Sequence, residues 1–221
     1  MVLNRFEAAM AESKAAICKS IAAVGAIVEN DNVMYINYYK AVYSQARIPE
    51  DNEWDASRES YDSALYPYYY REITFAALTL NNRGVSGYGD FCLTLNSRLI
   101  ANRAAVFETN SFNFIKKQME SGGIDPAGYR SSWPLRAKLA VAKLGGSLTI
   151  STVDALFPVI LLGSGERAGD FMEVHIYGSI HRRAIERVVR IGKKVRRQDA
   201  VLIKSMKRKL TEFGADYEEA P

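Results

Sequence analysis

The stretch Asp170-Phe171-Met172-Glu173-Val174-His175-Ile176-Tyr177-Gly178 is the part of the chain from which the rest can be interpreted. Its side chains alternate with a period of two up to Tyr177, and a glycine follows, which predicts a strand. One face of that strand carries Met172, Val174 and Ile176, and the other carries Phe171, Glu173, His175 and Tyr177. The second face places a carboxylate beside an imidazole between two aromatic rings. If this face is buried, the charge of Glu173 requires a partner group or a functional role. If the strand lies at the edge of a sheet, the same face is exposed to solvent.

The length of 221 residues and a hydrophobic content of 48% fit one domain with a real core. We expect residues 1–60 to form a helical N-terminal part and residues 61–180 an α+β core. Residues 181–213 are predicted to form a basic helix, followed by an acidic tail over residues 214–221. Helices come first and strands later, separated by long loops, which is typical of the α+β class.

Within this division, periodicity predicts individual elements. Residues 6–28 form an alanine-rich pattern typical of a helix, and residues 33–43 suggest a second helix. Residues 48–58 are polar and contain Pro49, which indicates a loop. Residues 88–96 predict a strand, while residues 71–80 fit either a buried strand or a short helix.

The amino-acid sequence shows neither a membrane-spanning pattern nor a Sec export signal. No apolar run approaches the roughly 18 residues that span a bilayer, and the first residues lack the order of a Sec signal. We therefore expect no transmembrane segment, and a location in the cytoplasm of the producer or delivery into a target cell without a Sec signal.

The two cysteines, Cys18 and Cys92, are too few for a disulfide framework or a zinc cluster. They indicate a reducing compartment or no dependence on redox state.

The net charge of +4 is concentrated late in the chain. Residues 182–209 contain twelve Lys/Arg and two acidic residues, a local charge of +10, so the remainder sums to −6. Apolar residues are interleaved with these cations, so a helix there has one face that packs and one that stays cationic. Such a face would dock an acidic partner, or would be a solvated face balanced by the acidic body of the chain.

Three separated blocks of the sequence, taken together, resemble one protein family. They are Arg71-Glu72-Ile73-Thr74-Phe75-Ala76-Ala77-Leu78-Thr79-Leu80; Gly87-Tyr88-Gly89-Asp90-Phe91-Cys92-Leu93-Thr94-Leu95 with Asn102-Arg103-Ala104-Ala105-Val106-Phe107 and Asn110-Ser111; and Glu173-Val174-His175-Ile176-Tyr177-Gly178 with Ala184-Ile185-Glu186-Arg187-Val188. Their order and spacing, over roughly residues 61–190, resemble bacterial toxin and effector-like proteins of the ADP-ribosyltransferase fold.

This resemblance implies a split mixed sheet and transfer of ADP-ribose from NAD to a macromolecular acceptor, protein or nucleic acid, or cleavage of NAD. It implies NAD as substrate and no metal. The implied catalytic residues are Glu173 and His175, and the implied NAD-binding residues are Arg71, Tyr88, Arg103 and Tyr177. An anion at Glu173 would stabilise the oxocarbenium-like ribose that forms as nicotinamide leaves. The chain departs from the family in carrying Phe171 two residues before Glu173, and in lacking a recognisable early strand with Arg or His followed by Ser-Thr-Ser.

Two other functions remain open at this point. Cys92 and His175, with Asp90 or Asp170, could form the pair of a Cys-His hydrolase or deamidase, although Cys92 in mid-strand is also typical of a buried structural cysteine. The other is a non-catalytic module whose basic helix docks an acidic partner or an inhibitor protein.

Overall fold

The computed structural model describes residues 1–122, 128–163, 165, 169–192 and 199–220. Its centre is an eight-stranded sheet with the order β10-β9-β4-β1-β3-β7-β5-β6, and β2 and β8 form a separate two-stranded sheet. Neighbours in the large sheet are antiparallel except β10 and β9, which are parallel. The fold is therefore α+β with a mixed sheet, as the order of elements predicts.

The strands of the large sheet are β1 (Lys14–Lys19), β3 (Ile73–Thr79), β4 (Phe91–Leu95), β5 (Ala104–Phe107), β6 (Arg130–Ser132), β7 (Glu173–Tyr177), β9 (Ile185–Arg190) and β10 (Asp216–Glu219). The small sheet consists of β2 (Met34–Tyr35) and β8 (Ile180–His181). The predicted strands at residues 88–96 and 171–177 are confirmed as β4 and β7. The ambiguous run at residues 71–80 contains the strand β3.

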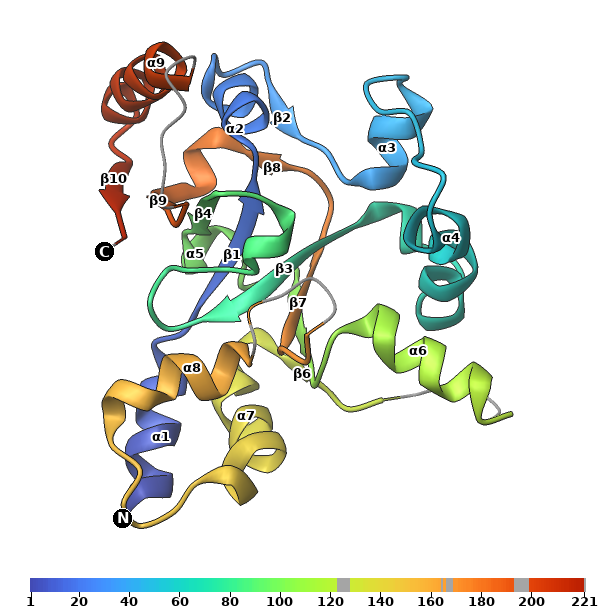
Figure 1. The fold of residues 1–221 in the computed structure, drawn as a ribbon, viewed down its shortest axis with the longest axis vertical. Helices are drawn as coiled ribbons and strands as arrows, with labels where there is room; N and C mark the ends of the chain where they lie inside the picture. The colour runs from blue at the N-terminus through green and yellow to red at the C-terminus, as the bar shows by residue number, and fades with distance from the viewer. Residues whose placement is uncertain (123–127, 164, 166–168, 193–198, 221) are drawn as a thin grey trace.

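The helices lie around this sheet in three groups (Figure 1). The first contains α1 (Val2–Ala11), α7 (Arg136–Leu144) and α8 (Phe157–Leu162); the second contains α2 (Ile21–Val28) and α9 (Asp199–Glu212); and the third contains α3 (Tyr38–Tyr43), α4 (Glu53–Leu65) and α6 (Ser111–Glu120), with the short α5 (Ser97–Ile100) beside β4. One-turn 3₁₀ segments occupy Tyr70–Glu72, Ser86–Tyr88, Trp133–Leu135, Gly145–Ser147, Asp154–Leu156 and Arg182–Ala184. Within the residues described, no helix is both long and apolar enough to cross a membrane.

The two faces of the sheet differ in what they bury. One face carries Met172, Val174 and Ile176 into the main apolar core, together with residues of β1, β4 and the first two helix groups. On the other face, Phe107 packs against α4 and α6, and Phe171 packs with Ala77 and Val85. The alternation predicted for residues 171–177 is thus observed, and both faces of β7 are covered, since only Tyr177 at its end is exposed.

The N-terminal part is not wholly helical, contrary to the prediction for residues 1–60. The stretch predicted as one helix at residues 6–28 is broken into α1, β1 and α2, and β1 pairs with β3 and β4 in the middle of the sheet. Ser20 ends the strand and caps α2 by accepting a hydrogen bond from the backbone N–H of Ala23 at 3.3 Å. Alanine-rich apolar residues suit a fully buried strand as well as a helix, so periodicity could not separate the two.

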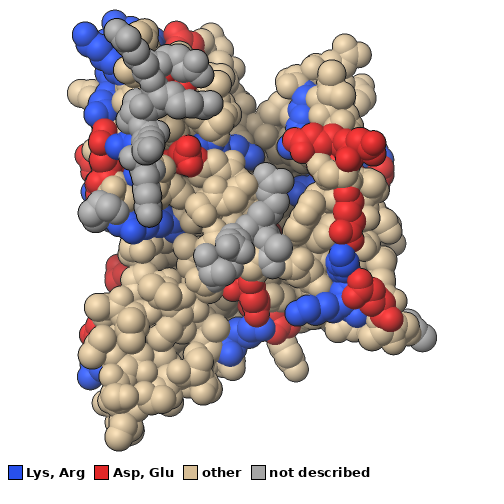
Figure 2. Space-filling view, in the orientation of Figure 1, with Lys and Arg blue, Asp and Glu red and all other residues tan. Residues whose placement is uncertain are grey.

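The predicted basic helix at residues 181–213 is also wrong. Its first third contains the end of β8, the 3₁₀ segment Arg182–Ala184 and β9, and among its described residues the α-helix α9 covers Asp199–Glu212. The acidic tail forms β10 beside β9, where Arg187 pairs with Asp216 and Glu218 at 2.9 Å each. Acidic and basic side chains therefore lie side by side over α9 and β10 (Figure 2). Lys193, Lys194, Arg196 and Arg197 lie outside the described residues.

The two cysteines are joined in a disulfide, which the sequence analysis did not predict. Cys18 on β1 and Cys92 on β4 are direct register partners in neighbouring strands. Because disulfides persist mainly in oxidising compartments, this pair argues against both expectations, a reducing compartment and no dependence on redox state.

We predict that Gly89→Ala lowers the free energy of unfolding by about 2 kcal/mol or more. Gly89 has φ +145°, and a Cβ there would lie 2.2 Å from the carbonyl carbon of Lys19, in the backbone of β1. Gly146→Ala is the control, because a Cβ at Gly146 meets nothing within 4 Å. Urea denaturation of both variants checks the prediction, and equal stability of the two would contradict it.

Candidate functional site

A pocket of about 410 Å³ lies on the second face of the sheet, between β1, β3 and β7 and the helices α2, α3, α4 and α6. Its volume is within the roughly 300–1,000 Å³ of small-molecule sites. Aromatic rings form much of its wall: Tyr35, Tyr38, Trp54, Phe75, Tyr88, Phe112 and Phe171. Its charged side chains are Lys19, Arg47, Arg58, Asp62 and Glu173.

Glu173 lines this pocket from the first position of β7, although the residue is only 7% exposed. Its Oε2 accepts hydrogen bonds from the backbone N–H of Ser111 at 3.1 Å and from Nε2 of His175 at 2.9 Å. Ser111 is the first residue of α6, and Asn110 caps that helix. The positive end of the helix dipole therefore points at the carboxylate. The helix N-terminus and two donors together offset the cost of burying this charge.

His175 lies behind Glu173 and does not line the pocket. Its ring packs on Phe75 and Phe107, at centroid distances of 5.1 and 5.5 Å, and its Nδ1 is hydrogen-bonded to the hydroxyl of Tyr66. Burial raises the pKa of Tyr66, so the hydroxyl keeps its proton and donates a hydrogen bond to Nδ1. Nε2 then carries the ring proton and donates a hydrogen bond to Glu173. His175 thus holds the Glu173 carboxylate in place, and the catalytic role expected for it from the sequence stays a prediction.

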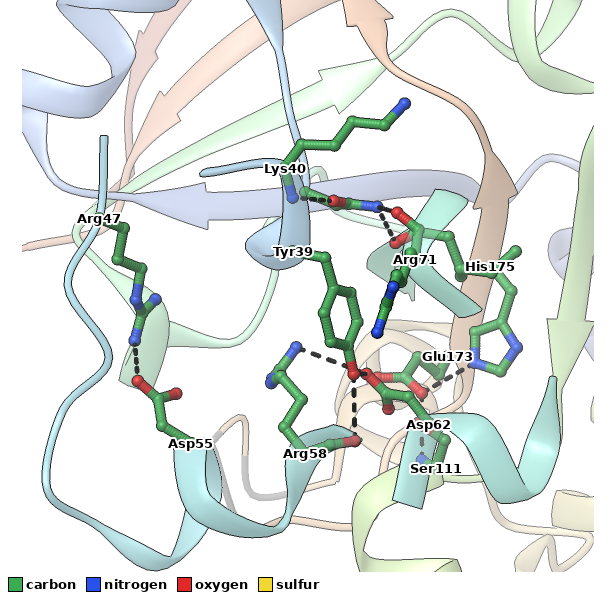
Figure 3. A network of polar contacts seen from close by, with 12 residues as sticks. Tyr39, Lys40, Arg47, Asp55, Arg58, Asp62, Arg71, Ser111, Glu173 and His175 are labelled. Carbon is green, nitrogen blue, oxygen red and sulfur yellow. Dashed lines mark hydrogen bonds and ion pairs between the residues drawn. The ribbon is translucent and has the colours of Figure 1, made fainter. Parts of the chain in front are cut away.

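Arg58 is a cation that lines the pocket with Glu173. Its guanidinium carbon lies 4.9 Å from the centroid of the Tyr38 ring and 6.0 Å from that of the Phe75 ring. Burial acts to lower its pKa, but the charge of Asp62 and further groups that include Glu173 outweigh it, and the pKa is raised. Among the described residues the Nε of Arg58 finds no hydrogen-bond acceptor. Figure 3 shows the side chains of Arg58, Asp62 and Glu173 pointing toward one another.

Asp62 is a second carboxylate in the same pocket, and it is 5% exposed. Its Oδ2 accepts a hydrogen bond from the hydroxyl of Tyr39 at 2.8 Å and lies 4.0 Å from Nη1 of Arg58. Burial raises the pKa of Asp62 to about 6, although Arg58 and Tyr39 act to lower it. The pocket therefore contains two carboxylates in different environments.

The residues expected to bind NAD are not gathered in one place. Tyr88 lines the pocket with Glu173. Arg71 is exposed and pairs with Glu59 at 2.7 Å, outside this pocket. Arg103 and Tyr177 lie at the other end of β7, where the Arg103 side chain donates to the Tyr177 carbonyl. These three positions do not share the pocket of Glu173.

Sequence reasoning missed Arg58 because residues 48–58 were predicted to be a loop, and Asp62 because no helix was predicted to continue beyond that loop. In the structure α4 begins at Glu53, and Asn52 caps it by accepting a hydrogen bond from the backbone N–H of Asp55 at 2.9 Å. Asn followed by acidic residues in the first turn is a helix start signal that the sequence does contain. Lys19, at the end of β1, was missed for a related reason, since β1 was predicted as helix.

The thiol mechanism is contradicted by the structure. The sulfur of Cys92 is bonded to Cys18, so neither is a nucleophilic thiolate, and His175 is occupied by Glu173 and Tyr66. The part of the chain that the structure describes contains no group of three or more His, Cys, Asp or Glu that could hold a metal ion.

We expect Asp62 to make stability depend on pH. Between about pH 4 and 6 the folded protein keeps a proton on Asp62 that the unfolded chain has released, so the free energy of unfolding falls as pH rises across this window. The loss should be up to about 3 kcal/mol, and Asp62→Asn should remove it. Urea denaturation of both proteins from pH 4.5 to 8 measures the difference. A difference that does not vary with pH would contradict the assignment.

No protein-family model and no curated protein matches the chain. Among solved structures, the chain is similar to Thermus sp. 2.9 DarT in complex with carba-NAD+, at 8% identity and a TM-score of 0.48, with 94% of this chain and 95% of that chain covered. It is also similar to Thermus sp. 2.9 DarT in complex with NAD+, at 8% identity and a TM-score of 0.47, with 94% of each chain covered. Similarity at this level does not define a function, so the chemistry proposed for this protein depends on its pocket.

Proposed function

We propose that the protein cleaves the bond between nicotinamide and ribose in NAD and passes ADP-ribose to a macromolecular acceptor or to water. The observation that carries this proposal is the carboxylate of Glu173, held at the N-terminus of α6 inside an aromatic pocket. A fixed anion at this position suits a reaction whose transition state gains positive charge on a sugar ring. The three sequence blocks that resemble ADP-ribosyltransferases agree with this chemistry.

In this reaction the C1″–N bond of the nicotinamide ribose breaks and its electron pair remains on nicotinamide. The ribose carbon becomes positively charged as the leaving group departs. Glu173 stabilises that charge, and because Ser111 and His175 already hold its carboxylate, little reorganisation is needed when the charge develops. His175 acts through Glu173 as a positioning residue.

The remaining charges of the pocket suit the other part of the same substrate. NAD carries two phosphates, and Lys19, Arg47 and Arg58 line the pocket with Glu173. Arg58 is best suited to a phosphate, because its Nε has no acceptor among the described residues and a guanidinium presents several donors in a planar fork. The aromatic wall offers ring faces for the adenine and nicotinamide groups.

The acceptor, protein or nucleic acid, and the location of the reaction in the producer or in a target cell stay predictions. Docking of an acidic partner on residues 182–209 is the alternative function. Within the described residues of that segment the cations are largely matched by the chain's own acids, as with Arg183 and Asp31 at 2.7 Å and Arg190 and Glu219 at 2.7 Å. We therefore prefer the enzymatic function.

The first test is Glu173→Gln, which keeps the size of the side chain and removes its charge. Nicotinamide release from NAD should fall by about two to four orders of magnitude, with a small change in stability. Glu186→Gln is the control, since Glu186 is a strand glutamate paired with Lys14 at 2.9 Å outside the pocket. If release by Glu173→Gln matches that of the wild type, Glu173 is not the catalytic carboxylate.

A second test compares two arginines. Arg58→Lys should raise the KM for NAD by about tenfold or more, because a point charge replaces a planar fork of donors. Arg71→Lys should leave KM within about twofold, because Arg71 is exposed and paired with Glu59. Steady-state kinetics of nicotinamide release measure both. The reverse order of effects would restore Arg71 as the phosphate ligand and exclude Arg58.

A further inference from the structure

We propose that Asp62 is a second catalytic residue, which accepts the proton of the nucleophile as that nucleophile attacks the ribose. This inference rests on the proposed function of the same pocket. It assigns stabilisation of the ribose cation to Glu173 and acceptance of a proton to Asp62. Asp62 comes from α4 and Glu173 from β7, and both line the pocket.

The hydrogen bonds of Asp62 leave one oxygen available for a proton. Tyr39 donates to Oδ2, and Arg58 is 4.0 Å from the same oxygen, beyond hydrogen-bond range. No described residue donates to Oδ1. A water molecule or an acceptor hydroxyl or amine in the pocket could therefore donate to Oδ1 without displacing a protein group.

A purely structural role does not account for an acidic residue at this position. An asparagine would accept the same hydrogen bond from Tyr39 without the cost of burying a negative charge. The nearest cation, Arg58, does not form a short ion pair that would offset this cost. Buried carboxylates that are weakly compensated are found at sites where a base is needed.

The two carboxylates are suited to different tasks. Glu173 is held by two donors and the N-terminus of α6, which stabilise its negative charge and leave it available to stabilise the ribose cation. Asp62 receives one hydrogen bond and is desolvated, which increases its affinity for a proton. Two carboxylates whose environments differ in this way form a common pairing of an electrostatic stabiliser and an acid or base.

The proposed step balances as follows. The C1″–N bond breaks and nicotinamide leaves with the electron pair. The oxygen or nitrogen of the nucleophile forms a new bond to C1″ and loses a proton to Oδ1 of Asp62. The protonated Asp62 then releases that proton to solvent. With water as nucleophile, NAD and water give ADP-ribose, nicotinamide and one proton.

The groups that influence the protonation of Asp62 come from three directions. They are Tyr38 and Tyr39 from α3, Arg58 from α4 itself, Tyr66 directly after α4, and Glu173 and His175 from β7. Glu173 acts to raise the pKa of Asp62, and Arg58, Tyr39 and His175 act to lower it. Removal of the Tyr39 hydroxyl should therefore raise this pKa.

The experiment measures NAD hydrolysis between pH 5 and 9 for the wild type, Asp62→Asn, Tyr39→Phe and Glu59→Gln. The wild-type rate should fall in acid with an apparent pKa of about 6. Asp62→Asn should lose about 10²-fold in kcat with KM little changed, and should lose this acid limb. Tyr39→Phe should move the limb to higher pH. Glu59→Gln is the control, because Glu59 is an exposed carboxylate on the same helix, outside the pocket.

Sodium azide separates a missing base from a damaged site. Azide carries no proton, so its attack on the ribose needs no base, and it should restore nicotinamide release by Asp62→Asn and form the azide of ADP-ribose. Azide should not restore Glu173→Gln, which lacks the stabilising charge. A structural role for Asp62 predicts no rescue by azide and no change in the shape of the pH profile.

The outcomes distinguish the two proposals. If the wild type and Glu59→Gln cleave NAD but Asp62→Asn keeps the wild-type rate and acid limb, the role of Asp62 is overturned and the proposed function stands. If Asp62→Asn is impaired and azide fails to restore it, the role as proton acceptor is likewise overturned. If the wild type releases no nicotinamide and forms no azide product, both proposals fail together.

Discussion

The Glu173 carboxylate is buried, and the rest of the site is arranged to compensate for the free-energy cost of burying its charge. An uncompensated charge at this depth costs several kcal/mol, so the surroundings must supply partners at fixed positions. The partner N–H groups come from Ser111 at the start of α6 and from His175 one pleat further along β7. Tyr66 fixes the imidazole in turn. The pairing of β7, the start of α6 and the end of α4 are therefore coupled through one carboxylate.

The parts of the molecule that the sequence predicted correctly are those that depend on the local order of residues. In a strand the side-chain direction repeats every two residues, so the positions of Glu173 and His175 on one face followed from the local order of residues alone. β4 was predicted for the same reason. The α+β class followed from the order of elements, which does not depend on where any single boundary falls.

Some of the missed features depend on contacts that are distant in sequence. The residues of β1 read equally well as helix, and only its pairing between β3 and β4 makes it a strand. The first part of α4 was predicted as a loop because residues 48–58 are polar and contain Pro49, and one of those polar residues is Arg58, which lines the pocket. In this way the polar residues of a site weaken the amphipathic pattern by which the helix would be recognised.

In the basic segment over residues 182–209, the local sum of charges likewise does not reveal which cations pair with acidic residues elsewhere in the chain. A sum of +10 over residues 182–209 predicts an electrostatic surface only if the cations lack partners. The parallel pairing of β10 with β9 brings the acidic tail alongside Arg187 and Arg190, and the excess is partly cancelled within the sheet. In the pocket the balance is different, because three cations and two carboxylates line one cavity and Arg58 comes no nearer to Asp62 than 4.0 Å. Cations suited to phosphates and anions suited to a sugar cation lie within a single pocket there, and that combination matches a dinucleotide that is negative at its phosphates and becomes positive at its reacting ribose.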